Sequence, residues 1–437
     1  MKKNNIALAL ALLATGCAAG PALAQSTSSV SLYGIIDVSV RAQSGLSGAN
    51  APAAGSMGSV NSGVGPTSRW GIRGSEDLGG GLRAIFNLES TLGADVGGIG
   101  GVAGTFDRAA IVGLAGHWGA VTAGRQNTLI SDSVGLVDPI ALRFAGLNPN
   151  IQVTSLTGHG LNNEWGATNT KVGSNRVNNS IKYSGSFGGL TARAMYSFGE
   201  TGVSASRLDT RGLGLDWRQD DLVLTSAYTQ FHDASGRTLD AANIGGAWSR
   251  GDLRLMLNYG RNKAETSDTA KTTNKILALG ARYAVTPVIG LNGGYYKVDR
   301  ERTGQGDDGF QRLIGFVDYQ LSKRTSLFLE LDTTKWKNGY QGAGNKTRAS
   351  GISLGITHNF CPPERLAPLP PGDDALGQAP PPRGGSCSAS LSWSTPVSQA
   401  VIVIRRPASP REIQLCRALG RGFFIYSYIH SRICINP

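Results

Sequence analysis

The segment from Ser68 to Leu92 contains two runs in which apolar and polar residues alternate, joined by a glycine-rich turn. Trp70 and Ile72 lie on one side of the first run, and Phe86 and Leu88 lie on one side of the second. Alternation with a period of two predicts a β-hairpin that has one apolar and one charged face. Such a hairpin separates an apolar medium from water, and that medium is either a protein core or lipid.

The N-terminus predicts export. Residues 1–24 contain two lysines, a short apolar run and small residues that end in Ala22-Leu23-Ala24. This pattern is typical of a secretory signal peptide, and its apolar run is too short to span a bilayer as a helix. We expect the mature chain to begin at Gln25. A lipid attached at Cys17 is a weaker alternative, because Ala14 stands where a larger aliphatic residue is usual.

Any membrane crossing after the signal peptide must use strands. No run of eighteen apolar residues follows it, so the sequence predicts no helical span. A closed β-barrel is the other structure that satisfies every backbone polar group in lipid. No cysteine lies between residues 25 and 360. An exported chain of this kind must be stable without disulfides, and a hydrogen-bonded barrel is stable in this way.

Alternating segments recur along residues 25–360 and predict about sixteen strands. Short turns and long polar loops join them in alternation, which is typical of an up-and-down antiparallel barrel. The predicted strands are Val30–Arg41, the two within 68–92, Phe106–Leu114, Ala120–Gln126, Val177–Ser184, Leu190–Phe198, Gly212–Trp217, Leu222–Tyr228, Ala242–Ser249, Leu253–Arg261, Ile276–Tyr283, Ile289–Val298, Gln311–Gln320, Thr325–Thr334 and Ser350–Phe360. The region after Arg41, up to Thr67, is expected to be a loop. The fold class is therefore all-β, a transmembrane barrel.

The polar faces of these strands are too highly charged for a dry core. Between residues 325 and 334, Leu329 and Leu331 alternate with Glu330 and Asp332. A soluble β-sandwich would bury these carboxylates at a cost of several kcal/mol each when unpaired. We therefore expect the aliphatic faces to point outward to lipid and the charged faces to line a lumen that holds water.

Four segments resemble the general diffusion porins of Gram-negative bacteria: SSVSLYGIIDVSV, SRWGIRGSEDLGGGLRAIFNLES, FDRAAIVGLAGHWGAVTAGRQ and GISLGITHNF. The resemblance covers roughly residues 1–360. It implies a sixteen-stranded outer-membrane barrel, usually a homotrimer, through which small hydrophilic solutes and ions diffuse passively. It also implies contacts with outer-membrane lipid, lipopolysaccharide and the outer-membrane assembly machinery.

Residues 128–171 show no strand period, and a loop of this length is usually functional. In the porins that the sequence resembles, the third loop folds into the lumen and its acids face a cluster of arginines. The resemblance places tentative loop acids at Asp132 and Asp138, although the usual turn is replaced by Asp138-Pro139-Ile140-Ala141. It places the basic side at Arg69, Arg73, Arg108 and Arg176. Arg125 and Arg193 are interpreted as solvated lumen residues.

The charge of the predicted barrel favours anions. Residues 25–360 hold 32 basic and 26 acidic side chains, a formal charge of +6. A net positive constriction attracts ions of the opposite sign. We therefore expect a mild anion preference.

The expected last strand ends at Phe360, which by resemblance is the signal for barrel assembly. Residues 361–437 follow it and hold 12 of the 18 prolines and four cysteines, without a sustained period. This composition predicts disorder. A frameshift or read-through explains the tail better than a periplasmic extension that binds a partner.

The sequence shows no pattern typical of an enzyme. The five histidines are scattered without metal-ligand spacing, and no nucleophile elbow occurs. Basic residues do not concentrate on one helix or stripe, so we expect no nucleic-acid partner, and we expect no cofactor. A substrate-specific channel of the same fold remains an alternative, and an adhesin or enzyme barrel is a weaker one.

Overall fold

The exterior of the sheet carries a band of exposed aliphatic side chains and its interior is mostly polar, the reverse of a soluble core. In β14 (Leu253–Glu265), Leu255 and Leu257 are 43% and 47% exposed, whereas Asn258 and Asn262 are fully buried. In β18 (Thr325–Lys337), Leu331 is 52% exposed.

The computed structural model describes residues 28–100, 104–152, 172–173, 175–200, 202 and 207–361, so the expected signal peptide and the tail after Cys361 lie outside the described residues.

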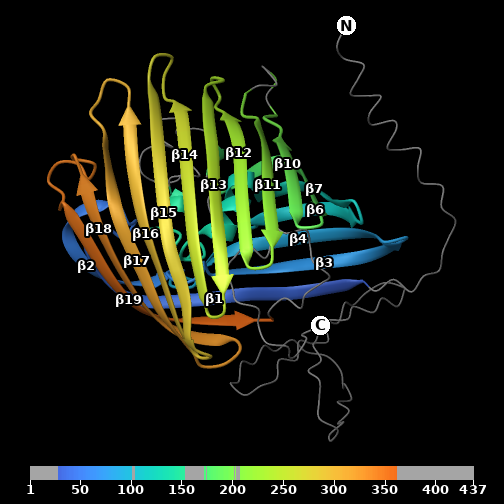
Figure 1. Cartoon of the computed structure of the whole chain (residues 1–437), viewed down its shortest axis with the longest axis horizontal. Coiled ribbons are helices and arrows are strands. Elements are labelled where there is room, and N and C mark those ends of the chain that lie inside the picture. Colours follow the sequence, from blue (N-terminus) through green and yellow to red (C-terminus); the bar gives the residue numbers. More distant parts are fainter. Residues whose placement is uncertain are drawn as a thin grey trace, which may run out of the picture.

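Sixteen antiparallel strands form one closed ring. Besides β14 and β18, the strands of the ring are β1 (Ser29–Leu46), β3 (Arg69–Gly79), β4 (Leu82–Gly93), β6 (Ala109–Gly116), β7 (Gly119–Asn127), β9 (Arg176–Phe187), β10 (Leu190–Ser197), β11 (Thr210–Gln219), β12 (Leu222–His232), β13 (Thr238–Arg250), β15 (Lys271–Thr286), β16 (Ile289–Arg302), β17 (Asp308–Gln320) and β19 (Arg348–Phe360). Figure 1 looks onto the wall formed by β10–β18, with β1, β3 and β4 curving away behind it. The predicted all-β barrel of about sixteen strands is confirmed.

The first and last strands close the ring. Gly34 of β1 pairs with Phe360 of β19, and the register continues to Ser44 and Ser350. The other edge of β1 pairs with β3 in its first half and with β2 (Pro52–Ser62) in its second half. The expectation of a loop before residue 67 was therefore wrong for β2, whose glycine and serine content hides the alternation of a strand.

Most strands extend further toward the long loops than the sequence predicted. The strand predicted at Ile276–Tyr283, for example, is β15 and begins at Lys271. Beyond the aliphatic band, outward-facing positions are polar as well as inward-facing ones, so the apolar period disappears although the hydrogen-bonded ladder continues. Two short additions, β5 (Gly98–Ile99) and β8 (Val172–Gly173), pair with β4 and β9.

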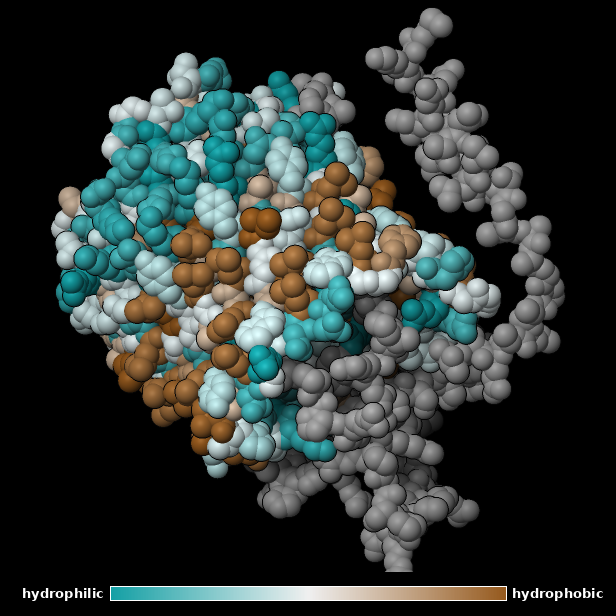
Figure 2. All heavy atoms as spheres, viewed as in Figure 1, coloured by the Kyte–Doolittle hydropathy of each residue, from teal (hydrophilic) through white to brown (hydrophobic). Residues whose placement is uncertain are grey.

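Figure 2 shows a band of apolar side chains across the near wall, with hydrophilic side chains above it. Exposed aromatic residues lie at the two borders of this band. Tyr228 and Tyr259 mark the border nearer the long loops, and Trp248 and Tyr283 mark the border nearer the short turns. No helix in the described ranges is long and apolar enough to cross a membrane.

Candidate functional site

Residues 128–152, here called the inner segment, lie against the polar face of the sheet. The segment includes α2 (Leu129–Val137) and α3 (Pro149–Gln152). The Thr128 hydroxyl caps α2 by accepting a hydrogen bond from the Ser131 amide at 3.2 Å. Ser133 is 2.6 Å from the Thr225 hydroxyl on β12, and Asn243 of β13 donates to Ser133 at 2.9 Å. These partners share the buried face of their strands, opposite the exposed leucines.

Glycines in the wall make room for the inner segment. A Cβ at Gly294 on β16 would lie 2.8 Å from the Pro139 Cβ. A Cβ at Gly245 on β13 would lie 2.6 Å from a methyl group of Val137. Real Cβ atoms do not approach other carbons this closely, so the segment can sit against these strands only where the side chain is absent. Inward-facing glycines are therefore a sequence signal for the docking of this segment.

The second half of the inner segment packs on an aromatic patch of the wall. Ile140, Phe144 and Leu147 form one buried cluster with aromatic side chains of β16–β18. The Arg143 guanidinium lies 3.6 Å from the centre of the Phe316 ring, and its Nη1 atom is 2.8 Å from the Asp318 carboxylate. Apolar packing and this ion pair hold the segment to the wall together.

Asp138 is enclosed by its own segment. Its carboxylate accepts hydrogen bonds from Asn150 at 2.8 Å and from the Leu142 amide at 2.7 Å, and Asn148 contacts both oxygens. Tyr296 of β16 reaches the same carboxylate at 3.3 Å. Burial raises the pKa of the Asp138 carboxyl above its ordinary value, although the amide donors oppose this rise. The structure does not bring Asp138 together with the four predicted arginines.

Asp132 is placed between two basic residues of the adjacent wall. Its Oδ2 atom is 2.8 Å from the Lys182 Nζ of β9 and 3.7 Å from the Arg193 Nη1 of β10. Arg193 also contacts Asp216 of β11 at 2.5 Å. Asp132 is 1% exposed. Arg193, interpreted from the sequence as a solvated residue, is instead 2% exposed and part of an ion-pair network.

Three of the predicted arginines, on β3, just before β6 and on β9, gather around one glutamate. Glu89 of β4 is 2.6 Å from Arg108, immediately before β6, and 3.6 Å from Arg69 of β3. The hydroxyl of Tyr33 on β1 donates to the same carboxylate at 2.9 Å. Arg176 at the start of β9 interacts electrostatically with Arg108 and Glu89.

Two further arginines extend this group. The Arg73 guanidinium lies 5.2 Å from the centre of the Tyr33 ring, and Arg125 of β7 interacts electrostatically with Arg176. The Arg125 Nε donates to the Asp107 main-chain oxygen at 2.6 Å. Arg69, Arg73, Arg108, Arg125 and Arg176 are here called the arginine cluster.

The arginine cluster is only partly neutralised. Within the described part of the chain, Glu89 and Asp107 are its carboxylate neighbours, and no carboxylate there forms an ion pair with Arg73 or Arg176. Glu89 was not among the site residues predicted from the sequence. The polar face of the opening hairpin could have identified it, because Glu89 alternates with Leu88 on that strand.

Phe360 occupies the last position of β19, the strand that closes the ring. Its ring fills the space above Gly34, the residue with which it pairs in the register. A side chain at position 34 would collide with this ring. The pairing of a glycine with a large aromatic residue therefore fixes the register of closure.

The comparisons with known proteins agree on one family. The sequence profile described as "Gram-negative porin" matches residues 7–339. The outer membrane porin protein 32 of Delftia acidovorans is 30% identical over 385 residues, covering 82% of this chain and all of that protein. The solved anion-selective porin from Comamonas acidovorans superposes with a TM-score of 0.61 at 27% identity, covering 76% of this chain and all of that one. The trimer form of OmpT, an outer membrane protein of Vibrio cholerae, has a TM-score of 0.56 at 17% identity, covering 76% of this chain and 99% of that one.

Proposed function

The chain belongs to the Gram-negative porin family, and we propose that its outer-membrane channel prefers small anions at a constriction formed by the arginine cluster and the inner segment. The channel itself is a passive route for small hydrophilic solutes. The observation that carries the preference is the shortage of carboxylates beside the arginine cluster. A related solved porin of the same fold is described as anion-selective.

The two sides of the proposed constriction contribute differently. Asp132 is paired with Lys182 and Arg193, and the Asp138 carboxylate is enclosed by amide donors. Neither described acid of the inner segment is left to balance the arginine cluster. A guanidinium about 8 Å from the permeation path in water changes the local anion concentration by about twofold. Several guanidinium groups together therefore produce an anion preference, although no site binds one particular solute.

The test is the reversal potential of the purified channel in a planar bilayer under a potassium chloride gradient. We expect an anion preference for the unmodified chain and a shift toward cations for the double variant Arg73→Gln/Arg176→Gln. Arg250→Gln, a change of an exposed residue at a short turn, is the control and should leave the reversal potential unchanged. Cation selectivity of the unmodified chain would refute the proposal, and saturable block by one solute would favour a substrate-specific channel.

The assembly of the barrel is a second part of the proposal. Phe360 serves as the recognition signal for the assembly machinery, and the folded chain forms a homotrimer. Residues 1–24 are removed as a signal peptide, and residues 361–437 are not part of the channel. Because residues after Phe360 interfere with recognition of that signal, a chain that ends at Phe360 should give more heat-modifiable, trimeric protein than the full chain. Equal yields of the two chains would contradict this role of the tail.

A further inference from the structure

The chain leaves the line of the barrel wall between β2 and β3. On β1, Val38 pairs with Ser62 of β2, and Ile35 pairs with Arg69 of β3. Between these pairs β1 has two residues, whereas the connection has six, residues 63–68. A strand that carries extra residues must leave the ladder locally. Residues 63–68 are here called the inward bend, because they turn toward the inner segment.

Asp37 of β1 holds the inward bend through its carboxylate and its main chain. Its Oδ1 atom accepts a hydrogen bond from the Gly65 amide at 3.0 Å, and its main-chain oxygen accepts one from the Gly63 amide at 3.2 Å. Thr357 of β19 donates to its Oδ2 atom at 2.5 Å. A Cβ at Gly65 would lie 2.2 Å from this Oδ2 atom. The bend can therefore approach the carboxylate only because residue 65 is a glycine.

The inward bend in turn holds the inner segment. The Gly65 carbonyl accepts a hydrogen bond from the Phe144 amide at 3.2 Å. Val64 is 1% exposed and belongs to the same apolar cluster as Phe144. Arg143 of the inner segment also interacts electrostatically with the Asp37 carboxylate. Asp37 is thus linked to the inner segment by two routes, through the bend and through charge.

Four residues earlier on the same face of β1, Tyr33 contacts the arginine cluster. Its hydroxyl donates to the Glu89 carboxylate at 2.9 Å, and its ring centre lies 5.2 Å from the Arg73 guanidinium. Gly71 is opposite Tyr33 on β3, and a Cβ there would lie 2.8 Å from the Tyr33 hydroxyl oxygen. A glycine between Arg69 and Arg73 in the strand therefore makes room for the tyrosine ring.

The strand β1 thus contacts both sides of the proposed constriction. Tyr33 and Asp37 are about 13 Å apart, because a strand rises about 3.3 Å per residue. Both edges of β1 are hydrogen-bonded, one to β19 and the other to β2 and β3. The spacing of the two side chains cannot change unless these ladders break. A strand held in this way is a common reference for two elements that are far apart in the sequence.

We propose that Asp37 is the positioning residue that sets the distance between the inner segment and the arginine cluster. Asp37 is fully buried and acts through the inward bend, without contact with the permeating solute. Without its carboxylate, the bend loses its anchor, and the Phe144 end of the inner segment leaves the wall for part of the time. The inference rests on the proposed function only in placing the constriction between these two elements.

The test is single-channel recording of the full chain in a planar bilayer with equal potassium chloride on both sides. A released inner segment appears as time spent outside the main open level. Loss of a hydrogen bond to a charged group shifts an equilibrium by about 10-fold or more. We therefore expect Asp37→Ala to spend about 10-fold more time outside the main open level than the unmodified chain. An unchanged fraction would overturn the proposal.

Ser39→Ala is the matched control on β1. Ser39 is the next residue on the same face, is 2% exposed, and its hydroxyl has no hydrogen-bond partner among the described residues. This variant should record like the unmodified chain. Asp37→Asn keeps an oxygen acceptor for the Gly65 amide but loses the charge beside Arg143, so its fraction should be intermediate. A lower heat-modification temperature for Asp37→Ala with unchanged recordings would show a role in stability alone and would overturn the proposal.

Gly65→Ala tests the same contact from the other side, and it decides the question where Asp37→Ala does not fold. The added methyl group collides with the Asp37 carboxylate and should also increase the time outside the main open level. In Asp37→Ala/Gly65→Ala the carboxylate is absent, so the second substitution should add less than about twofold. Changes that act through one contact are not additive. No effect of Gly65→Ala, or effects that multiply in the double variant, would overturn the assignment.

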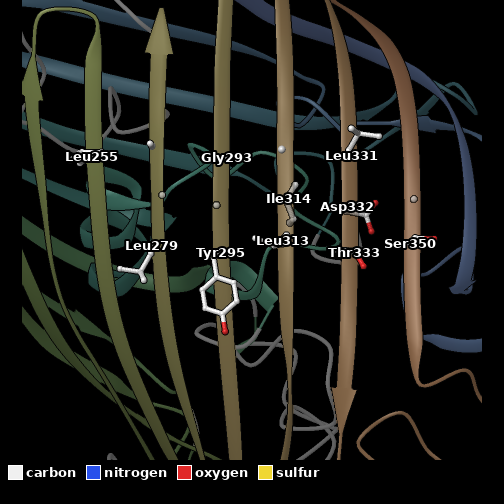
Figure 3. A pocket seen from close by; sticks show the side chains of 15 residues that line it. Leu255, Leu279, Gly293, Tyr295, Leu313, Ile314, Leu331, Asp332, Thr333 and Ser350 are labelled. Atoms are coloured by element: carbon white, nitrogen blue, oxygen red, sulfur yellow. The ribbon is translucent and has the colours of Figure 1, made fainter.

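Gly293→Ala is the control for an added methyl group. Figure 3 shows bare backbone at Gly293 on the outer wall, near the Tyr295 side chain, and a Cβ there would have its nearest neighbour 4.0 Å away. This variant should record like the unmodified chain. Recordings at equal salt do not depend on ion preference. A cation-selective channel would therefore refute the proposed anion preference and leave the role of Asp37 standing.

Discussion

Two groups of arginines on the inner wall differ in how they are neutralised. Arg41 of β1 is 2.9 Å from Glu330 and 2.5 Å from Asp332, so one guanidinium is shared by two carboxylates. In the arginine cluster, five guanidinium groups surround Glu89 and Asp107. The first group lies beneath the inner segment, where the Arg41 guanidinium is 4.7 Å from the centre of the Phe144 ring.

The difference separates a structural role from an electrostatic one. A guanidinium that is closely matched by carboxylates adds little to the field in the channel, and its removal leaves buried charges without a partner. A guanidinium in a group with excess positive charge contributes to the field in the lumen. Burial alone does not distinguish the two roles, because Arg69 and Arg108 are each only 7% exposed.

The largest effect is expected for Arg41→Met. It leaves Glu330 and Asp332 buried without their partner, and breaking such a pair costs about 3–5 kcal/mol. In a heat-modification gel assay, we expect the variant to shift from the folded to the unfolded band at a lower temperature than the unmodified chain. The control Arg250→Met changes an exposed residue, and its free energy of unfolding should stay within about 0.5 kcal/mol of that of the unmodified chain. A stable Arg41→Met barrel would show that this group is not structural.

Glu89→Gln tests the other group. It removes the carboxylate that contacts Arg69 and Arg108. The loss of a charged hydrogen bond should lower the free energy of unfolding by about 1.5–3 kcal/mol. The lost negative charge should also raise the anion-to-cation permeability ratio by about twofold. The reversal potential measures this ratio, with the exposed turn change Asp252→Asn as control. A shift toward cations would contradict the assignment of the field to this cluster.

Two neighbouring glycines of β16 test how the inner segment is held. Gly294→Ala places a methyl group against Pro139. This overpacking should lower the free energy of unfolding by about 1–3 kcal/mol. It should push the segment toward the lumen, so single-channel conductance falls and open-channel noise rises. Gly293→Ala faces outward into open space and is the matched control. Identical conductance for both variants would mean that the inner segment does not rest on Gly294.

The smallest effect concerns pH. Because burial raises the folded-state pKa of Asp138, the stability of the docked segment is greatest below the ordinary carboxyl pKa of about 3.9 and declines as pH rises toward the folded-state value. Open-channel noise should therefore increase with pH across this interval in the unmodified chain. Asp138→Asn cannot titrate, so its noise should not depend on pH in the same interval. A decrease of noise with rising pH in the unmodified chain would contradict this linkage.

The fold could be predicted from the sequence because the bilayer imposes a simple rule on every strand. Leucines at alternate positions, as in 253–259, identify the outer face without knowledge of the rest of the molecule. The rule fails where the strand leaves the apolar band. It also fails at β2, where glycine and serine occupy both faces and leave no alternation.

The site could be predicted only in part, for a physical reason. The positions of Arg69, Arg108 and Arg176 follow from the strands that carry them, so their gathering is a property of the fold. Asp132 and Asp138 lie on a segment without a period. The partner of Asp132, Lys182, depends on how that segment docks on the wall, and the partner of Asp138, Asn150, depends on how the segment folds on itself. The glycines at 245 and 294 carried the docking signal, but glycine also occurs in strands at bulges and at tight bends, where nothing docks.

The pairing of Gly34 with Phe360 joins the first and last strands of the barrel, so the ring cannot close until the final strand is available. Until then β1 and β19 each expose a row of unpaired backbone groups that could add to any other strand. Contacts this distant in sequence are slow to form, because a long loop must close before they contribute any stability. The growing sheet therefore needs protection for most of its folding time. The exposure ends when β19 pairs with β1 and the Phe360 ring packs over Gly34.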